Sequence, residues 1–246
     1  MHVLTVYAHP NPKSFCHAVL EKFTAGLKEA GHTCEILDLY AVRFNPVFTI
    51  RDYAGYVHES MPLDVLEGMD LKQRILDNSG GPIQRFIASR WLQGKDLQAM
   101  ARLVRSQMPR DVVAHQQKIA RAQGLAFIAP VYWCHFPAIL KGWFERVFNY
   151  GFAYALKPEG WRGELKGRVP LLTHEKALAI TPTMFKQDDY QRAGLESAMK
   201  TLIDDWGLRY PGIRNVEHIY FYHVDNDNSQ SYLERAYQLG KEFSHE

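Results

Sequence analysis

The chain has 246 residues, with 29 Lys and Arg against 27 Asp and Glu, a formal net charge of +2 and 46% hydrophobic residues. This length favours a single domain over residues 1–246, and the composition excludes an intrinsically disordered chain. The near-neutral charge predicts neither nucleic acid nor a membrane as a partner. Three cysteines without a C-x-x-C pair exclude a disulfide framework, and no targeting segment is visible, so we expect a cytoplasmic protein.

Short β-branched and aromatic runs alternate with helical patterns along most of the chain. The runs predict strands at 3–8, 33–39, 125–131, 177–181 and 216–224. The helical patterns cover 14–30, 137–150, 191–206 and 229–243. Because the first strand, helix and second strand make one βαβ unit, the pattern predicts an α/β protein with a doubly wound, five-stranded parallel sheet.

A long segment between the second and third strands does not follow this pattern. Residues 44–123 are polar and rich in helical patterns, and Gly80, Gly81 and Pro82 interrupt them. We expect a helical insertion, part of it an expanded crossover and part a lid or an interface piece. A surface decoration without a role of its own is the favoured interpretation.

The turn after the first strand, residues 9–16, lies where ligands bind in open α/β sheets, at the carboxyl ends of the strands. It contains neither G-x-G-x-x-G nor G-x-x-x-x-G-K-[ST], which excludes the Rossmann and P-loop types of site. A helix starts at Ser14, and its N-terminus, with Lys13 and His9 beside it, suits a phosphate. An equally weighted alternative to phosphate binding is that Ser14 only caps the helix and that His9 is a packed side chain. Cys16 near this N-terminus could have a lowered thiol pKa, but a packing role is favoured.

The turn after the third strand, residues 129–137, carries an unusual number of aromatic side chains. Tyr132, Trp133 and Phe136 could line a flat heterocycle by stacking on it and excluding water. For an average sequence, an aromatic plug of the core is the commoner explanation.

Two long motifs then show a resemblance. Residues 7–15 read Tyr-Ala-His-Pro-Asn-Pro-Lys-Ser-Phe, and Pro130-Val-Tyr-Trp is followed by the helix 136–148 and by Gly151-Phe-Ala-Tyr. This pattern closely resembles the NAD(P)H:quinone oxidoreductase family of flavodoxin-like flavoproteins. It covers most of 1–45 and 120–245, but not 60–115. The resemblance implies a flavodoxin-like doubly wound fold with a helical insertion between the second and third strands.

The resemblance implies that the first turn holds the flavin phosphates and ribityl chain and that the later turns line the ring. Together with our own interpretation of the first turn, the expected cofactor-binding residues are His9, Lys13, Ser14, Phe15, Cys16, Pro130, Val131, Tyr132, Trp133, Cys134, Phe136, Thr181, Pro182, Thr183 and Met184. The next helix, with Glu145 and Arg146, is expected near the adenine end and the dimer contact. No pattern predicts a metal site.

One turn departs from the family. After the fourth strand the family has Thr-Thr-Gly-Gly, whereas this chain has Thr181-Pro182-Thr183-Met184. Pro182 has no N–H to donate, and Met184 adds bulk where glycine leaves space. Two catalytic candidates remain: Tyr154, which the family presents across a homodimer interface into the neighbour's site, and Tyr190, which could replace the family's active-site tyrosine.

The resemblance implies a flavin-dependent NAD(P)H oxidoreductase that reduces quinones or similar flat acceptors by two-electron, ping-pong hydride transfer. FAD is favoured over FMN, and either NADPH or NADH fits as the electron donor. The altered 181–184 turn leaves open an azo, nitro or biosynthetic acceptor, or a protein with this fold that has lost catalysis. A small electron carrier fits less well, because such carriers are strongly acidic. We expect a homodimer with shared active sites and a small aromatic or quinone-like substrate.

Overall fold

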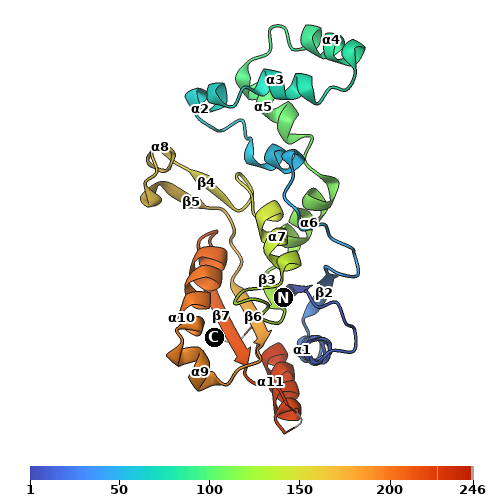
Figure 1. The fold of residues 1–246 in the computed structure, drawn as a ribbon, viewed down its shortest axis with the longest axis vertical. Coiled ribbons are helices and arrows are strands. Elements are labelled where there is room, and N and C mark those ends of the chain that lie inside the picture. The colour runs from blue at the N-terminus through green and yellow to red at the C-terminus, as the bar shows by residue number, and fades with distance from the viewer. Residues whose placement is uncertain (226, 245–246) are drawn as a thin grey trace.

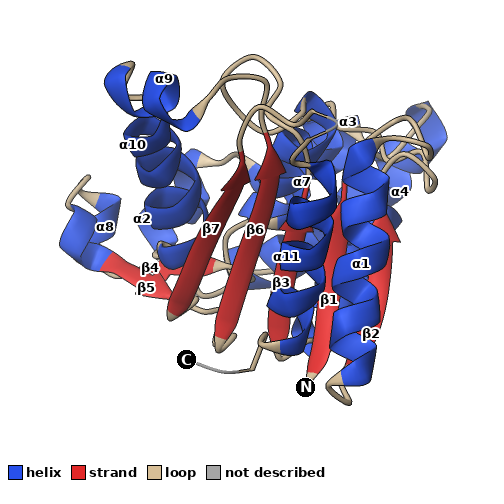
Figure 2. Ribbon diagram, turned by 90° about the horizontal axis from the view of Figure 1, so that it is seen from below, coloured by secondary structure: helices blue, strands red, loops and turns tan. Residues whose placement is uncertain are grey.

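Five parallel strands form the centre of the molecule in the computed structural model, which describes residues 1–225 and 227–244 (Figure 2). The strands are β1 (His2–Tyr7), β2 (Thr33–Asp38), β3 (Gly124–Ile128), β6 (Lys176–Pro182) and β7 (Asn215–Phe221). Their order is β2-β1-β3-β6-β7. The predicted five-stranded, doubly wound parallel sheet is therefore confirmed.

Helices cover both faces of this sheet. On one face lie α1 (Phe15–Glu29) and α11 (Ser229–Lys241), and on the other lie α6 (Arg110–Arg121), α7 (Ala138–Val147) and the π-helix η3 (Lys200–Arg209). Helices α1 and α11 pack closely against each other at Gly26 of α1. A Cβ on Gly26 would lie 2.0 Å from the Tyr237 carbonyl oxygen, so no other residue fits there without moving a backbone.

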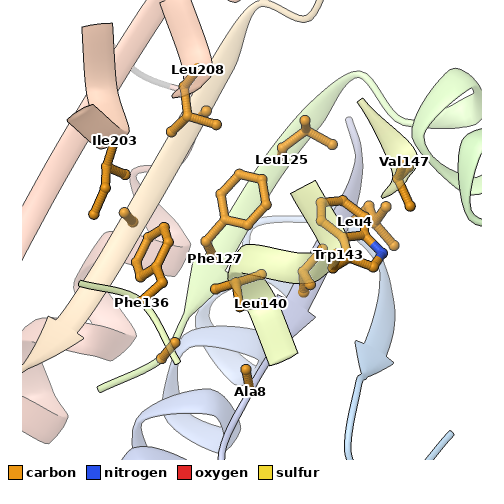
Figure 3. Close-up of a cluster of buried hydrophobic side chains, with 14 of the residues drawn as sticks. Leu4, Ala8, Leu125, Phe127, Phe136, Leu140, Trp143, Val147, Ile203 and Leu208 are labelled. Atoms are coloured by element: carbon orange, nitrogen blue, oxygen red, sulfur yellow. The ribbon is translucent and has the colours of Figure 1, made fainter. Parts of the chain in front are cut away.

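Alternation along the strands divides the core into two layers. In β1, Leu4 and Val6 point to the α7 side, while Val3 and Tyr7 point to the α1 side. The α7 layer is the larger, and Trp143 and Phe127 are among the side chains buried in it (Figure 3).

Several predicted boundaries were wrong, each for a local reason. Gly194, at φ +71°, separates α9 (Gln187–Arg192) from α10 (Leu195–Met199) inside the segment that the sequence pattern predicts as one helix from 191 to 206, and α10 continues directly into η3. The third strand ends at Ile128, two residues before Pro130, and the fifth ends at Phe221 rather than 224.

The insertion between β2 and β3 has two parts. Its last helix, α6, is the crossover that returns the chain to the sheet. The 3-10 helix η1 (Ile50–Tyr56) leads to a group of four helices that we call the arm: α2 (Leu63–Gly68), α3 (Leu71–Asp77), α4 (Pro82–Trp91) and α5 (Leu97–Arg105). Figure 1 shows the arm at one end of the molecule, beyond the sheet. Leu66, Leu71 and Ile75 of the arm are buried in a hydrophobic cluster that also includes Ala54 and Tyr150.

A short antiparallel hairpin projects beside α7 and was not predicted. It consists of β4 (Tyr154–Leu156) and β5 (Arg168–Pro170), with α8 (Pro158–Trp161) and η2 (Leu165–Gly167) between them. Within the described part of the chain, every helix is too short or too polar to cross a bilayer.

Candidate functional site

Three turns meet at the carboxyl edge of the sheet, after β1, β3 and β6. The strands end in register, with Tyr7 opposite Ile128 and Ile128 opposite Ile180. Backbone bonds continue beyond the strands: the Val131 N–H donates to the Pro182 carbonyl at 3.1 Å. The sheet therefore brings together the turns that contain the fifteen expected cofactor-binding residues.

The first turn is held by its own polar side chains. The Asn11 N–H donates to His9 Nδ1 at 3.1 Å, and Asn11 Oδ1 accepts from the Lys13 N–H at 2.9 Å. Ser14 caps α1, its Oγ accepting from the His17 N–H at 3.2 Å. The N–H groups of Phe15 and Cys16 have no intrahelical acceptor at these positions, so they and the exposed Lys13 offer donors and charge to an anion.

The second turn raises two residues into solvent. Tyr132 and His135 exchange backbone hydrogen bonds of 2.9 and 3.2 Å across Trp133 and Cys134, whose φ angles are +48° and +64°. These are the angles of a type I′ turn, which normally requires Asn or Gly. Trp133 is 98% exposed, and the Tyr132 ring lies 6.3 Å from the His9 ring, measured between centroids. An unfavourable backbone thus presents a large aromatic side chain at the sheet edge.

Phe136 and Trp133 face different surroundings. Phe136 is 3% exposed and stacks on Phe144 at 6.2 Å, so it belongs to the core. For this residue the aromatic-plug interpretation is correct, whereas Tyr132 and Trp133 are surface aromatics.

The third turn uses its backbone differently from a glycine-rich loop. The Thr183 N–H donates to the Phe221 carbonyl at 2.8 Å, which extends the β6–β7 ladder by one residue. That donor is therefore committed to the sheet. The Met184 side chain is 75% exposed.

A buried hydroxyl and a buried thiol lie beneath the first turn. The Tyr7 hydroxyl lies near Ser14 and Tyr132, but it makes no hydrogen bond of good geometry within the described part of the chain. Burial raises the pKa of Tyr7 to about 12. Burial also raises the pKa of Cys16 to about 12, so the lowered value considered from its helix position was wrong. Cys16 is a packing residue.

The two catalytic candidates lie in different places. Tyr190 is buried on α9 among aromatic rings, and burial raises its pKa, against a contact with Thr183 that lowers it. Tyr154 lies on β4 and lines a cavity of about 280 Å³ between α7 and η3. That cavity also includes His135 and Phe136, which join it to the second turn. Burial raises the pKa of Tyr154 as well, so both hydroxyls stay protonated at neutral pH.

A buried polar network that the sequence analysis missed lies under the third turn. His218 on β7 contacts Asp204 of η3 through Nδ1 at 2.9 Å and Thr181 Oγ1 through Nε2 at 2.8 Å. The side chains of His218 and Asp204 are 3% and 6% exposed. The rings of His218, Tyr220 and Tyr222 stack along β7 toward Tyr190. The one signal in the sequence is the period-two spacing of 218, 220 and 222 on a predicted strand.

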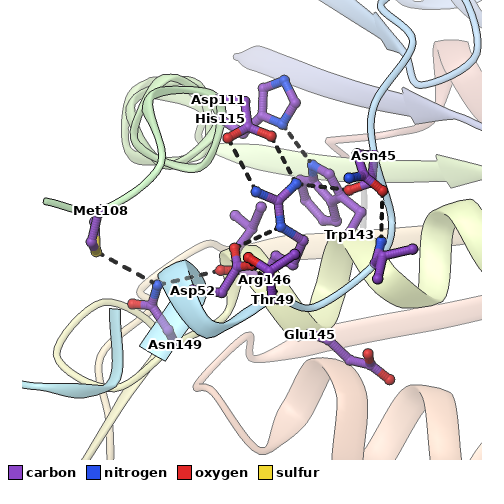
Figure 4. A network of polar contacts seen from close by, with 12 residues as sticks. Asn45, Thr49, Asp52, Met108, Asp111, His115, Trp143, Glu145, Arg146 and Asn149 are labelled. Atoms are coloured by element: carbon purple, nitrogen blue, oxygen red, sulfur yellow. Dashed lines mark hydrogen bonds and ion pairs between the residues drawn. The ribbon is translucent and has the colours of Figure 1, made fainter. Parts of the chain in front are cut away.

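Arg146 is turned inward rather than toward a ligand. Its Nε donates to Asp52 at 2.7 Å, and its terminal nitrogens donate to Asp111 at 2.7 and 3.2 Å and to the Asn45 carbonyl at 2.7 Å (Figure 4). This ion network joins η1 and α6 to α7. Arg146 is therefore a structural residue, and the position of its helix near the adenine end stays a prediction.

The donors at the sheet edge fit a flavin nucleotide. A helix N-terminus with Lys13 and His9 suits its phosphates, and the exposed rings of Tyr132 and Trp133 suit a flat heterocycle. The buried Tyr7 hydroxyl beside Ser14, which makes no hydrogen bond of good geometry among the described residues, is a further polar group there. The third turn offers a flavin fewer backbone donors than a glycine-rich loop would. Pro182 lacks an N–H, and the Thr183 N–H already donates to the Phe221 carbonyl.

Comparison with known proteins agrees with this geometry. A family model described as the flavodoxin-like fold matches residues 1–241. NAD(P)H dehydrogenase (quinone) 1 of Rattus norvegicus is 31% identical over 170 residues, which are 69% of this chain and 51% of the relative. The chain thus spans about half the length of the first curated relatives that it matches.

Two further matches cover nearly whole chains. An uncharacterised NAD(P)H oxidoreductase of Haemophilus influenzae is 25% identical over 242 residues, 97% of this chain and 93% of the relative. The structure of an NAD(P)H:quinone oxidoreductase from Methanothermobacter marburgensis is 29% identical, with a TM-score of 0.69, and covers 100% of this chain and 97% of that one. The similarity therefore includes the arm as well as the sheet.

Proposed function

Because the chain belongs to the flavodoxin-like fold family, we propose that it is a flavin-dependent NAD(P)H oxidoreductase that reduces quinones or similar flat acceptors. The observation that carries the proposal is the meeting of the α1 N-terminus with the exposed Tyr132 and Trp133 at the carboxyl edge of the sheet. A relative named as a quinone oxidoreductase that matches over 97% of its length supports the same activity.

The proposed roles follow from the chemistry of each turn. Lys13, Ser14 and the first amides of α1 bind phosphate, since a helix N-terminus stabilises an anion. Tyr132 and Trp133 orient the ring and exclude water from one of its faces. A flavin bound there supplies hydride chemistry with NADPH or NADH as donor, in a ping-pong sequence. We favour FAD, with FMN as the alternative.

The acceptor is proposed to enter the cavity beside Tyr154. This cavity is lined by Phe136, Phe144 and Phe148 as well as Tyr154, which suits a flat aromatic molecule. Burial keeps the Tyr154 hydroxyl protonated, so it can donate a hydrogen bond to an acceptor oxygen. We further propose a homodimer in which Tyr154 serves the neighbouring site.

A second candidate is favoured by the third turn. Because Pro182 and Thr183 offer no free N–H, the acceptor could instead be an azo, nitro or biosynthetic compound whose reduction depends less on backbone donors in this turn. The two candidates share the flavin and differ only in the acceptor.

Steady-state kinetics tests the proposal. Purified protein reconstituted with FAD or FMN is mixed with NADPH or NADH and with a benzoquinone, a naphthoquinone, an azo dye or a nitroaromatic. Fast oxidation of the nicotinamide with the quinones, along parallel double-reciprocal lines, supports the proposal. Turnover with the azo or nitro compounds alone selects the second candidate, and no turnover with any acceptor refutes both.

A further inference from the structure

One helix of the arm has an apolar face that is largely open to solvent, with Lys95 Nζ 3.9 Å from the centre of the Trp91 ring at its end. None of the residues of α4 is buried, and Ile83, Phe86, Ile87 and Trp91 are 74, 65, 60 and 52% exposed. Their spacing of three, one and four residues places them on one side of a helix. A folded protein rarely leaves such a face in water unless it has a partner.

The α2 and α4 ends of the arm differ in charge, while α3 between them holds Lys72, Arg74 and Asp77, the last of which pairs with Arg85 at 3.2 Å. Residues 59–70, which contain α2, hold four acidic and no basic side chains: Glu59, Asp64, Glu67 and Asp70. Residues 82–104, which contain α4 and most of α5, hold four basic side chains, Arg85, Arg90, Lys95 and Arg102, and one acidic side chain, Asp96. The net charge of +2 for the whole chain hides this separation. In Figure 1, α2 and α4 lie on opposite sides of the arm.

We propose that the arms of two copies of this chain pair about a two-fold axis, with the basic α4 of each copy against the acidic α2 of the other. A two-fold interface brings one surface against itself in the reverse direction, so a surface that is acidic at one side and basic at the other is complementary to its own copy. The exposed Leu63 on α2 and the four apolar residues of α4 supply the area to be buried.

Other occupants fit less well. An anionic bilayer would attract α4 and repel α2 in the same arm, and α4 pairing only with α4 of the second copy would oppose like charges. The pairing needs no flavin and goes beyond the proposed activity. It is a contact additional to the shared-site dimer proposed above.

Charge reversal tests the pairing directly. We expect R85E/R90E and, separately, D64K/E67K to lower the molar mass of the flavin-reconstituted protein in light scattering by half, while each variant alone stays folded. An equimolar mixture of the two variants should regain the mass, because both of its contacts are then complementary. The matched control K22E/K28E, on exposed positions of α1, should keep the wild-type mass.

Other results would overturn the pairing. An unchanged mass in both reversed variants, or an equal loss in the control, contradicts it. So does wild-type binding to phosphatidylglycerol vesicles that R85E/R90E abolishes without a change in mass, since the occupant would then be lipid. As a second readout, amide exchange in α2 and α4 should slow with rising protein concentration, and exchange that is independent of concentration contradicts the proposal. Flavin absorbance of the same samples reports separately on the proposed function.

Discussion

His218 and Asp204 form a pair inside the protein, with 2.9 Å between Nδ1 and Oδ1 and less than a tenth of either side chain exposed. The pair joins η3 to the edge strand β7, and through His218 Nε2 it also holds the Thr181 hydroxyl at the end of β6. Three elements that surround the third turn are therefore fixed by one imidazole.

Removing this imidazole should leave a buried carboxylate without its partner. We expect His218→Leu to lower the free energy of unfolding by about 3–5 kcal/mol, as measured by urea denaturation. The double variant His218→Leu, Asp204→Leu should lose less than the sum of the two single losses, because the second change removes the stranded charge. Strictly additive losses would mean that the pair is not coupled.

The Arg146 network gives a second prediction about stability. Arg146→Met should cost about 3–5 kcal/mol, because the Asp52 side chain is fully buried and would lose its cation. Asp111→Asn should cost much less, since the Asp111 side chain is 42% exposed. Burial acts to raise the pKa of Asp111, but the hydrogen bond and charge of Arg146 outweigh this effect, so the pKa is lowered overall. Equal losses in the two variants, measured by urea denaturation, would contradict this division.

The His115–Trp143 hydrogen bond predicts a loss of stability in acid. The Trp143 Nε1–H donates to His115 Nδ1 at 3.2 Å, which requires an unprotonated Nδ1. Burial lowers the pKa of His115. The unfolded chain therefore binds the proton more readily than the folded chain. The contribution of His115 to the free energy of unfolding is thus present above about pH 6.5 and is lost as the pH falls below that value.

A glutamine at this position removes the titration but keeps an acceptor for Trp143. We expect His115→Gln to reduce the difference in unfolding free energy between pH 7.5 and pH 5.5. Other buried histidines, such as His174, whose pKa burial also lowers, account for the remainder. A pH dependence that is identical to that of the wild type would show that His115 is not responsible.

The turn at Trp133 and Cys134 predicts a substitution that raises stability rather than lowering it. Cys134 has a φ of +64°, which glycine adopts without steric cost. We expect Cys134→Gly to raise the free energy of unfolding by up to about 1 kcal/mol, as measured by urea denaturation.

Trp133→Ala should leave stability nearly unchanged but weaken flavin binding, as followed by flavin fluorescence. Flavin binding that is insensitive to Trp133 would remove this ring from the site.

Tyr154 tests the proposed role of the cavity in the reaction. Tyr154→Ala should lower turnover with a quinone much more than it lowers flavin affinity, because the residue lines the cavity beside α7 and not the phosphate turn. Tyr154→Phe keeps the ring and should show how much of the loss depends on the hydroxyl. Full activity in Tyr154→Ala would contradict a role in the reaction.

The sequence predicted the sheet well, because buried parallel strands are short apolar runs and the helices between them are amphipathic. It predicted the three turns for the same reason, since the carboxyl ends of the strands meet at one edge. Pairings between distant segments could not be predicted: the bond of Thr183 to Phe221 and the contact of Thr181 with His218 depend on strand order.

Local conformations without a typical residue were also missed. The type I′ turn at Trp133 and Cys134 lacks the glycine or asparagine that would predict it from sequence. The three-residue strands of the β4–β5 hairpin are too short to show a periodic pattern. The structural role of Arg146 was missed because a charged residue on a helix gives no sign, in sequence, of the buried carboxylate that it meets.

The visible spectrum of the purified protein, before and after anaerobic addition of NADPH or NADH, tests the central claim most directly. We expect a bound flavin with yellow absorbance that bleaches on addition of the nicotinamide and returns when a quinone is added. A protein that stays colourless after incubation with excess FAD and with excess FMN would contradict it, and the altered 181–184 turn would then mark a chain that keeps the fold without the cofactor.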